Sequence, residues 1–359
     1  KLGQKNITIV EKNYINSGAS GRNGGGVRMQ FSTKTNIELM KESISICGNF
    51  AKEMGIQVWF RQGGYLFIAE NIEQQKLLEQ NILLQNECNV PTRLLAVSEA
   101  LQIVPQLEKK NIKAAAYNPK DGVVFPWPFL WGYLSKAKEL GVSVFTDHEV
   151  YQFDIQADKI TDVYIKDKKN NVAKVLKPQI IINAAGAWSP QIAQLAKVSL
   201  PNKPFRHEIF VTESLRSFLS PLVSVLSTGF YISQSLRGEL VGGISDKHEQ
   251  STLTMESSLR FLLRMSYHFC KLFPSLADIK VIRQWAGCYD VTPDHNPILG
   301  FVDDIANFFQ INGFVGHGFM MAPIISKLCA EYIVKAQKNA VFEEYALSRC
   351  KEKRANQEK

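Results

Sequence analysis

The spacing of apolar positions divides the chain into segments of helical and of strand-like periodicity. Residues 33–55 carry apolar side chains at helical spacing, and Ile37, Met40 and Ile44 mark the face that this helix would bury. Further helices are expected over residues 71–87, 98–104, 128–140, 255–272 and 320–336. Strands are expected over residues 7–10, 64–69, 142–145, 149–153, 179–183 and 308–312, with a hairpin over 159–176. Helices and strands interleave, as is typical of an α/β protein.

The stretch from residue 204 to residue 245 has a different pattern, because apolar and polar residues alternate there with a period of two. Such alternation is typical of antiparallel sheets with one buried face. After it the chain returns to strand 308–312, a glycine-rich turn and a long helix. We therefore expect one domain built from segments at both ends of the chain, with a mostly antiparallel domain inserted between them.

The first strand ends on Glu11, and the glycine-rich loop GASGRNGG follows at residues 18–25. In a dinucleotide-binding unit, the second strand ends on an acidic residue for the ribose, about 20 residues after a G-x-G-x-x-G turn. No such turn and no Met precede this strand, so we expect roughly 25 residues to be missing before Lys1. A merely flexible surface loop is the alternative interpretation of the glycines.

Composition narrows the class of protein. The 359 residues are 45% hydrophobic and 21% charged, which is ordinary for a globular protein. The net charge of +8 comes without a basic stripe interleaved with aromatics, so nucleic acid is not an expected partner. The six cysteines lack metal-ligand spacing, so we expect no metal site and free thiols in a reducing, cytoplasmic compartment. Association with an anionic membrane surface stays open.

Three further stretches suggest a cofactor site. Residues 183–188 (NAAGAW) place small side chains after a strand that we expect to be buried on both faces. Residues 313–320 (GFVGHGFM) lead into a helix, whose N-terminus attracts negative charge. Residues 283–294 contain Tyr289 and a Thr-Pro-Asp turn. Each stretch has an alternative interpretation without a cofactor. Residues 183–188 could serve tight helix–strand packing, His317 could be a structural histidine, and Tyr289 could be a core aromatic.

Taken in this order, the motifs of the chain resemble those of the D-amino-acid oxidase-like superfamily of flavoproteins. The sarcosine oxidase, glycine oxidase and dye-linked proline dehydrogenase β-subunit branch is the most similar, from Leu2 to about Ala336. The resemblance implies an α/β fold in which a Rossmann-type domain binds FAD and an inserted, mostly antiparallel domain binds substrate. It assigns residues 1–60, 140–200 and 280–340 to the FAD domain, residues 61–139 and 201–279 to the substrate domain, and residues 341–359 to a basic tail.

The resemblance also implies site residues. Glu11 would bind ribose, the backbone of Val150 would touch adenine, and Arg28 would lie close to the flavin ring. The implied cofactor-binding residues are Glu11, Ser20, Gly21, Arg22, Asn23, Gly24, Gly25, Val150, Ala185, Gly186, Trp188, Gly313, Gly316, His317, Gly318, Phe319 and Met320. The implied catalytic or substrate-pocket residues are Arg28, Tyr289, His317 and Tyr231.

Departures from the family pattern refine these expectations. Phe31 stands where monomeric sarcosine oxidases have an arginine that binds the substrate carboxylate, and Met320 stands where they have a lysine. Their flavin-linked cysteine aligns with Gly287, one residue before Cys288, so non-covalent FAD is expected over covalent attachment. The G-H-G-F-M turn is similar to the corresponding turn of proline dehydrogenase-type β-subunits, which pass electrons onward rather than to oxygen.

We therefore expect FAD-dependent dehydrogenation of a small amino acid or secondary amine, of the proline, sarcosine or glycine type. Hydride would pass from the α carbon to flavin N5, and the electron acceptor would be oxygen, a quinone or a partner subunit. A hetero-oligomer is compatible with this reading. Two alternatives stay open: a non-catalytic subunit or truncated remnant, and an FAD enzyme for a non-amine such as a 2-hydroxy acid. Because the G-x-G-x-x-G turn is absent, we expect residues 1–359 to bind FAD poorly or not at all.

Overall fold

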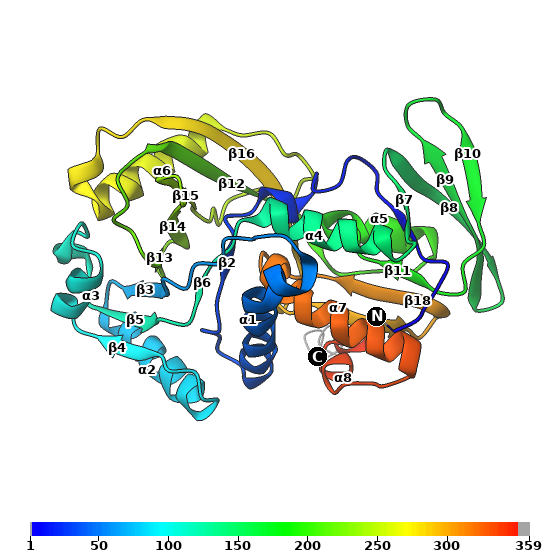
Figure 1. Cartoon of the computed structure of the whole chain (residues 1–359), viewed down its shortest axis with the longest axis horizontal. Coiled ribbons are helices and arrows are strands. Elements are labelled where there is room, and N and C mark those ends of the chain that lie inside the picture. Colours follow the sequence, from blue (N-terminus) through cyan, green and yellow to red (C-terminus); the bar gives the residue numbers. More distant parts are fainter. Residues whose placement is uncertain (1, 351–359) are drawn as a thin grey trace.

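The computed structural model describes residues 2–350 and consists of two parts that lie side by side (Figure 1). One part is built on an eight-stranded sheet with α6 on its outer side. The other contains the long helices α1 and α7, several short strand pairs and the projecting strands β8, β9 and β10. This mixed α/β architecture confirms the expected fold class.

The eight-stranded sheet is antiparallel except at one pair, β13 and β3, which run parallel. In order across the sheet, its strands are β16 (Val281–Val291), β12 (Lys203–Ser214), β15 (Glu239–Gly243), β14 (Phe230–Gln234), β13 (Leu222–Val225), β3 (Tyr65–Ala69), β5 (Ala114–Asn118) and β4 (Arg93–Leu95). The alternating pattern after residue 204 thus correctly predicted antiparallel strands. Strand β16 pairs with β12 in this sheet, although the division made from the sequence grouped it with the FAD-binding segments.

The helices beside this sheet are α2 (Ile72–Glu87), α3 (Val97–Ile103) and α6 (Leu259–Leu272), with the short 3-10 turns η2 (Lys109–Asn111) and η4 (Pro274–Leu276). Residues of α3 and α6 share one apolar core with the sheet, in which Phe210, Phe230 and Phe273 are almost fully buried. Every second side chain of the strands points to this face of the sheet, and these apolar side chains form the other half of the core.

The second part contains strands that pair in small groups. They are β1 (Thr8–Val10) with β7 (Ser143–Phe145), β2 (Gly26–Val27) with β6 (Gly122–Val123), β8 (His148–Gln156) with β9 (Lys159–Asp167) and β10 (Ala173–Leu176), and β11 (Ile181–Asn183) with β18 (Ile305–Asn312) and β17 (Ile298–Val302). The β1–β7 and β11–β18 pairs are parallel. The β9–β10 pair is the hairpin expected over residues 159–176.

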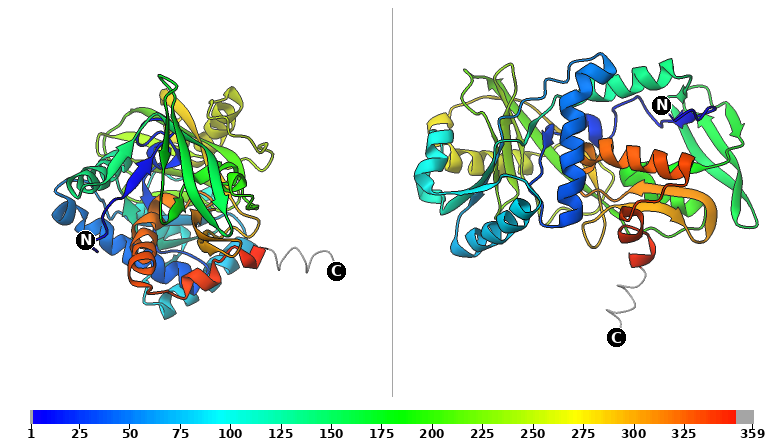
Figure 2. Two further views of the ribbon diagram at one scale, coloured as in Figure 1. Left: turned by 90° about the vertical axis from the view of Figure 1, so that its right-hand side faces the viewer. Right: turned by 60° about the horizontal axis from the view of Figure 1, so that its bottom comes forward.

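The helices of the second part include two long ones that pack against each other, as both views in Figure 2 show. The helices are α1 (Lys34–Met54), α4 (Pro126–Glu139), α5 (Ser189–Leu195), α7 (Gly318–Lys335) and α8 (Val341–Glu344), with the 3-10 turns η1 (Ala19–Arg22) and η3 (Gly186–Trp188). Helix α1 matches the expected helix over residues 33–55. Thr33 caps it by accepting a hydrogen bond from the Asn36 amide at 3.3 Å, and Gly55 ends it at φ +70°.

Strand β18 lies between two apolar cores. Phe309 packs with α1 and α7, whereas Phe308 packs with β8, β9 and α5, and neither side chain is exposed. Because successive side chains of a strand point to opposite faces, a strand buried on both sides must be apolar throughout. The strand therefore fixes where α7, and the turn that precedes it, can lie.

Strand β11 differs from its prediction. The sequence suggested a strand buried on both faces, but Ile180 is 38% and Ile182 is 48% exposed. The physical reason is that β11 pairs only with β18 in the part of the chain that the structure describes, so its other edge is open. The first strand of the chain, β1, likewise leaves Ile7 and Ile9 about 40% exposed (42% and 39%).

Packed structure continues beyond residue 340. Val341, Phe342 and Tyr345 are each at most 3% exposed, and Arg349 pairs with Asp294 at 3.0 Å. The chain therefore folds back onto the core where the sequence suggested the start of a tail. Residues 351–359, which carry the basic end of that expected tail, lie outside the described residues.

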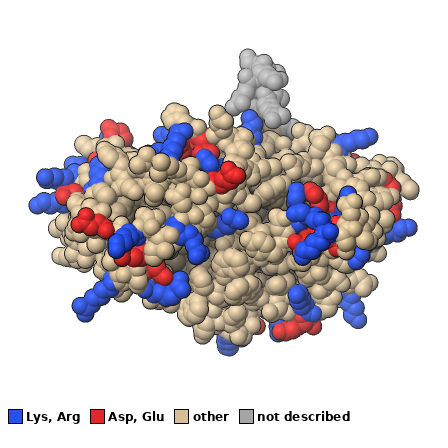
Figure 3. Space-filling view, turned by 90° about the horizontal axis from the view of Figure 1, so that it is seen from above, with Lys and Arg blue, Asp and Glu red and all other residues tan. Residues whose placement is uncertain are grey.

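The outer surface carries both signs of charge. On the face in Figure 3, basic and acidic side chains are interspersed around a largely uncharged centre. Within residues 2–350 no helix is both long enough and apolar enough to span a bilayer.

Candidate active site

The glycine-rich loop is tied to the eight-stranded sheet by Arg22. Its Nε donates to the Ser17 carbonyl at 2.8 Å and its Nη1 to the Ala286 carbonyl at 2.9 Å. The Trp285 indole donates to the Arg22 carbonyl at 2.9 Å. The arginine that we expected to contact FAD therefore also fixes the loop against β16.

The glycine-rich loop passes so close to the Val124 backbone that residue 25 must be glycine. Gly25 has φ +76°, and a Cβ there would lie 2.0 Å from the Val124 carbonyl oxygen. Next to it, the backbone of Gly24 lies against the Tyr231 ring, since a Cβ there would be 3.3 Å from that ring. Asn23, which accepts from the Gly25 amide at 2.6 Å, holds the turn. The loop thus reaches one of the expected pocket residues, Tyr231.

Arg28 follows this loop and contacts His317. Its Nη2 lies 3.1 Å from His317 Nε2, its Nη1 donates to the Gln30 carbonyl, and its guanidinium stacks on the Phe31 ring at 4.0 Å. Burial lowers the pKa of Arg28, and the nearby charge of Asp121 opposes this shift. Within residues 2–350 no carboxylate forms a direct ion pair with the guanidinium.

His317 is neutral in this setting. Burial and the charge of Arg28 lower its pKa to about 3. Because a guanidinium can only donate, Nε2 must accept from Arg28, so the proton of the neutral ring resides on Nδ1. Both residues are partly exposed, and Arg28 alone carries the positive charge of this pair.

A buried carboxylate, Asp121, holds the segment that carries Arg28. It accepts from the Met29 amide at 2.7 Å, from Asn118 Nδ2 at 2.8 Å and from Gln30 Nε2 at 3.0 Å. Asp121 is 0% exposed, and burial raises its pKa to about 7. The sequence did not single out this residue, because an isolated Asp in a loop carries no motif.

Asp290 holds the turn before α7. Its Oδ2 accepts from the Gly313 amide at 2.6 Å, and its carbonyl accepts from the Val315 amide at 3.0 Å. Burial raises the pKa of this carboxyl to about 6. Gly316 then lies against Tyr289, since a Cβ there would be 2.7 Å from the ring. The turn therefore brings Tyr289 and His317 to one place.

Three aromatic rings pack together next to this turn. His207 on β12 stacks on Tyr289 at a centroid distance of 4.5 Å, and its Nε2 lies 3.2 Å from the Tyr231 hydroxyl. Contacts thus link Arg28 to His317 and, separately, link the three rings to one another, to Gly316 and to Gly24. The role of Arg28, His317, Tyr289 and Tyr231 as pocket residues stays a prediction. The sequence did not single out His207, because one histidine in an alternating strand gives no distinct signal.

The other expected cofactor residues lie on three further segments of the chain. Glu11 follows β1, where its Oε1 accepts from the Asn13 amide at 2.9 Å and from Ser17 Oγ at 3.3 Å. Val150 is in β8 and pairs with Ile165 of β9. Ala185, Gly186 and Trp188 form η3 after β11, where Asn183 fixes the chain by donating to the Ser189 carbonyl at 3.0 Å.

These residues have the features that a bound FAD requires. A Cβ added at Gly18 or Gly186 would meet no atom within 4 Å, so both backbones border open space. Helix α7 begins without a side-chain cap, which leaves its first N–H groups for a ligand. The residues named above therefore fit the cofactor that their motifs imply.

Cys288 points away from the glycine-rich loop. A Cβ at Gly287 would lie 3.4 Å from Arg22, whereas the Cys288 thiol donates to the Thr254 carbonyl at 3.4 Å. Neighbouring residues of β16 face opposite sides of the sheet, and burial raises the pKa of this thiol. Both observations disfavour attachment of a flavin to Cys288.

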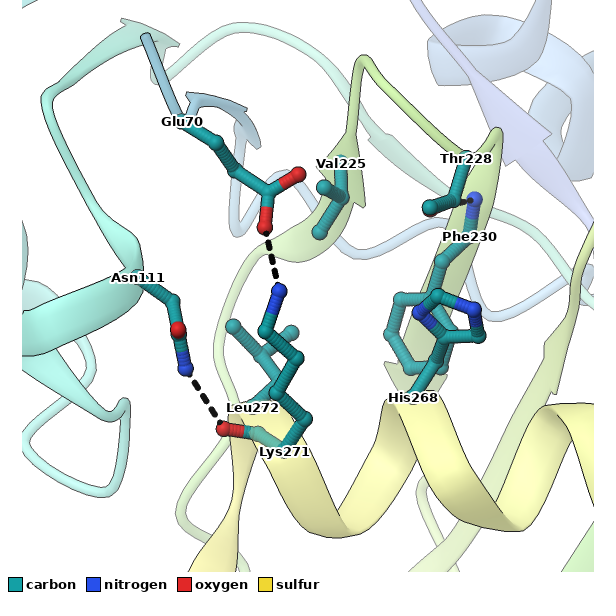
Figure 4. A pocket seen from close by; sticks show the side chains of 8 residues that line it. All are labelled: Glu70, Asn111, Val225, Thr228, Phe230, His268, Lys271 and Leu272. Atoms are coloured by element: carbon teal, nitrogen blue, oxygen red, sulfur yellow. Dashed lines mark hydrogen bonds and ion pairs between the residues drawn. The ribbon is translucent and has the colours of Figure 1, made fainter.

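A small hollow elsewhere is separate from this constellation. It lies beside α6, and its lining residues are drawn in Figure 4. Lys271 donates to Glu70 at 3.1 Å, and Asn111 donates to the Lys271 carbonyl at 2.9 Å. Its charged groups therefore satisfy each other.

The glycine-rich backbone and the polar side chains beside it suit a flavin-dependent oxidoreductase. The family model described as "FAD dependent oxidoreductase" (DAO) matches residues 1–332, and the chain belongs to this family. Its cofactor is FAD.

Relatives and solved structures agree with this assignment. The chain is 24% identical to sarcosine oxidase subunit beta of Rhodobacter capsulatus, covering 95% of this chain and 84% of that protein. It is 27% identical to FAD-dependent oxidoreductase domain-containing protein 1 of Xenopus laevis, covering 93% and 74%. It resembles the crystal structure of L-proline dehydrogenase from P. horikoshii with a TM-score of 0.89 and 33% identity, covering 96% and 91%.

Proposed function

We propose that the protein is an FAD-dependent dehydrogenase or oxidase of a small amino acid or secondary amine, of the proline, sarcosine or glycine type. The observation that carries this proposal is that two unlike groups of side chains meet at the turn before α7. Arg28, beside His317, supplies a cation, and Tyr289, next to Gly316, supplies neutral hydrogen-bonding groups together with His207 and Tyr231. An α-amino acid carries a carboxylate and an amine on a single carbon, so these two groups of side chains suit its two ends.

The residues of the chain have distinct tasks in this proposal. Arg28 binds the carboxylate, and the neutral ring of His317 fixes the guanidinium by accepting from it. Tyr289 and Tyr231 present hydroxyls to the amine. Loss of hydride from the carbon next to a neutral nitrogen would leave an iminium ion, which water would hydrolyse to a carbonyl compound and an ammonium ion. FAD, when bound, supplies the oxidising group, and the residues that would hold it are Glu11, the loop 18–25, the 185–188 turn and the start of α7.

Two relatives support the amine class by their names, sarcosine oxidase subunit beta and L-proline dehydrogenase. The first is a subunit, so we also propose that this chain works within a hetero-oligomer. Oxygen, a quinone and a partner subunit are the candidate electron acceptors.

The test is anaerobic reduction. L-Proline, sarcosine, glycine and, as a non-amine, L-lactate are added in turn to the protein in the presence of excess FAD, which compensates for the weak binding expected above, while the flavin band near ~450 nm is recorded. Bleaching by an amino acid supports the proposal. Bleaching by lactate alone would assign a 2-hydroxy acid substrate, and no bleaching by any of the four would contradict the proposal.

A further inference from the structure

A path of buried polar side chains connects the 313–318 turn with the 185–188 turn. The path consists of five side chains on four segments of the chain, each at most 7% exposed: Asp290, Asn202, Asn312, Gln310 and Asn183. At one end, Asp290 Oδ2 accepts from the Gly313 amide at 2.6 Å. At the other end, Asn183 Oδ1 accepts from the Ala185 amide at 3.4 Å. Two segments that would hold FAD are therefore linked through the interior of the protein.

The middle of the path is continuous. Asn202 Nδ2 donates to Asp290 Oδ1 at 2.9 Å and to Asn312 Oδ1 at 3.0 Å. Gln310 Oε1 accepts from Asn312 Nδ2 and from Asn183 Nδ2, both at 2.9 Å. Each side chain thus bonds directly to the next one, so a change in the direction of one amide acts on its neighbour.

The direction of each amide is fixed by groups that can act in only one way. An ionised carboxylate and a backbone carbonyl only accept. Asn202 must therefore turn its Nδ2 towards Asp290, and Asn183 must turn its Nδ2 towards the Ser189 carbonyl at 3.0 Å. Among the described residues, Asn202 Oδ1 and Gln310 Nε2 have no hydrogen-bond partner. Turning either amide round would place like atoms opposite each other on both of its sides, so these two atoms stay unpaired.

This agreement depends on the carboxylate. In Asp290→Asn, the new amide could accept from Gly313 only by turning its own NH2 towards Asn202 Nδ2, so two donors would face each other. If Asn202 turned round in response, the conflict would pass to Asn312 and then to each following amide. It could not disappear, because the Ser189 carbonyl at the far end only accepts.

We propose that Asp290 is a positioning residue of the cofactor site, whose carboxylate orients this path and thereby holds the 313–318 turn and the 185–188 turn in one arrangement. The inference rests on the cofactor placement given under the proposed function, to which it adds the residue that couples the two turns. It does not depend on which substrate is oxidised.

The test is nuclear magnetic resonance of the full chain without FAD. Spectra are recorded at about pH 8, above the pKa of about 6 that burial gives Asp290. Asp290→Asn replaces a charged acceptor by a weaker neutral one, so the Gly313 amide proton should shift. The Ala185 amide proton should shift as well, although it lies at the other end of the path.

A cut in the path separates coupling from a merely structural effect. Asn312→Leu removes the link between the two turns. In this background, Asp290→Asn should still shift the Gly313 amide but should no longer shift the Ala185 amide. Asn307→Leu is the matched control, because Asn307 is a buried amide of the same strand that bonds the backbone of β9 instead. It should leave the response of Ala185 to Asp290→Asn unchanged.

The outcomes at Ala185 decide the coupling. An Ala185 amide that does not respond to Asp290→Asn, or that responds equally after Asn312→Leu, would overturn the inference. If Asp290→Asn does not fold, Asn202→Leu breaks the path at its second member and should shift both amides. A shift confined to Gly313 in that variant would overturn the inference too.

Addition of FAD distinguishes this inference from the proposed function. Excess FAD should shift the amides of both turns in the wild type. Asp290→Asn should need about fivefold more FAD for half of this shift, as one weakened hydrogen bond predicts, and Asn307→Leu should not. Equal FAD affinity of Asp290→Asn and wild type would overturn the positioning role. If FAD shifts neither turn of the wild type, the proposed cofactor placement fails, whatever the spectra without FAD show of the path.

Discussion

At the scale of single residues, Arg28 is the group on which ligand charge depends. It contacts aromatic rings and one histidine, and the charge of the buried Asp121 acts on it without a direct ion pair. We expect Arg28→Met to weaken the binding of pivalate, a carboxylate without an amine, by roughly 2 kcal/mol, or about thirtyfold, measured by calorimetry. Arg237→Met is the matched control, because Arg237 is 83% exposed and pairs with Glu239. Equal affinity of the Arg28 variant and the control for pivalate would show that Arg28 does not bind the ligand.

His207 also predicts an acid sensitivity of the fold. Its pKa is lowered to about 4 in the folded protein, whereas an unfolded histidine titrates near ~6.5. The unfolded chain therefore binds more protons between these values, so this stabilisation is complete above about pH 6.5 and is lost as pH falls towards 4.

Replacing His207 should remove that loss. We expect His207→Phe to gain roughly 2 kcal/mol relative to wild type when pH drops from 7 to 4.5, measured by urea unfolding at both values. The exposed His248, changed to Phe, is the control and should show no such gain. Buried Asp121 and Asp290 have raised pKa values and so oppose the effect in the wild type, but they are common to all three proteins.

At the scale of elements, the glycine-rich loop offers a matched pair of substitutions. Gly25→Ala would place a methyl 2.0 Å from the Val124 carbonyl at φ +76°, whereas Gly18→Ala would meet no atom within 4 Å. We expect the first to lower stability by about 3 kcal/mol or more and the second by less than about 1 kcal/mol, measured by thermal unfolding. Similar stability of the two variants would mean that the loop does not approach Val124 as described.

Elements also show how well periodicity predicts structure. The helix expected over residues 33–55 and the hairpin over 159–176 both formed, because a long amphipathic pattern and a polar turn are local properties. Strand β11 was wrongly expected to be buried on both faces, because burial depends on the strands that flank it rather than on its own composition.

At the scale of the whole molecule, the parallel pairs β1–β7 and β11–β18 are not joined in residues 2–350, and both leave isoleucines exposed. The weak FAD binding expected of residues 1–359 stays a prediction. Absorbance of purified 1–359 protein should show much less than one FAD per chain, and a 1:1 ratio would refute it.

Any flavin that is present should appear in the supernatant after denaturation, because Cys288 faces away from the loop. Flavin retained by the precipitate would indicate covalent attachment.

The sequence by itself determined the local elements, the family and the segments that carry the site. Glu11 after a strand, the loop at 18–25 and the turn at 313–320 are contiguous motifs, and each is readable without the fold. The sequence also suggested Arg28, Tyr231, Tyr289 and His317 as pocket residues, and their role stays a prediction.

Only the tertiary structure decided which side chains meet and what charge they bear. His207 reaches Tyr231 across β15 through the space left at Gly243, a contact between strands that no sequence spacing encodes. Likewise, Asp121 accepts a hydrogen bond from Met29, which is far from it in the sequence. Gly287 and Cys288 face opposite sides of β16, because this strand lies between the glycine-rich loop and residues 252–254. The physical reason is that burial and hydrogen bonding, which set protonation and orientation, arise from long-range packing rather than from local sequence.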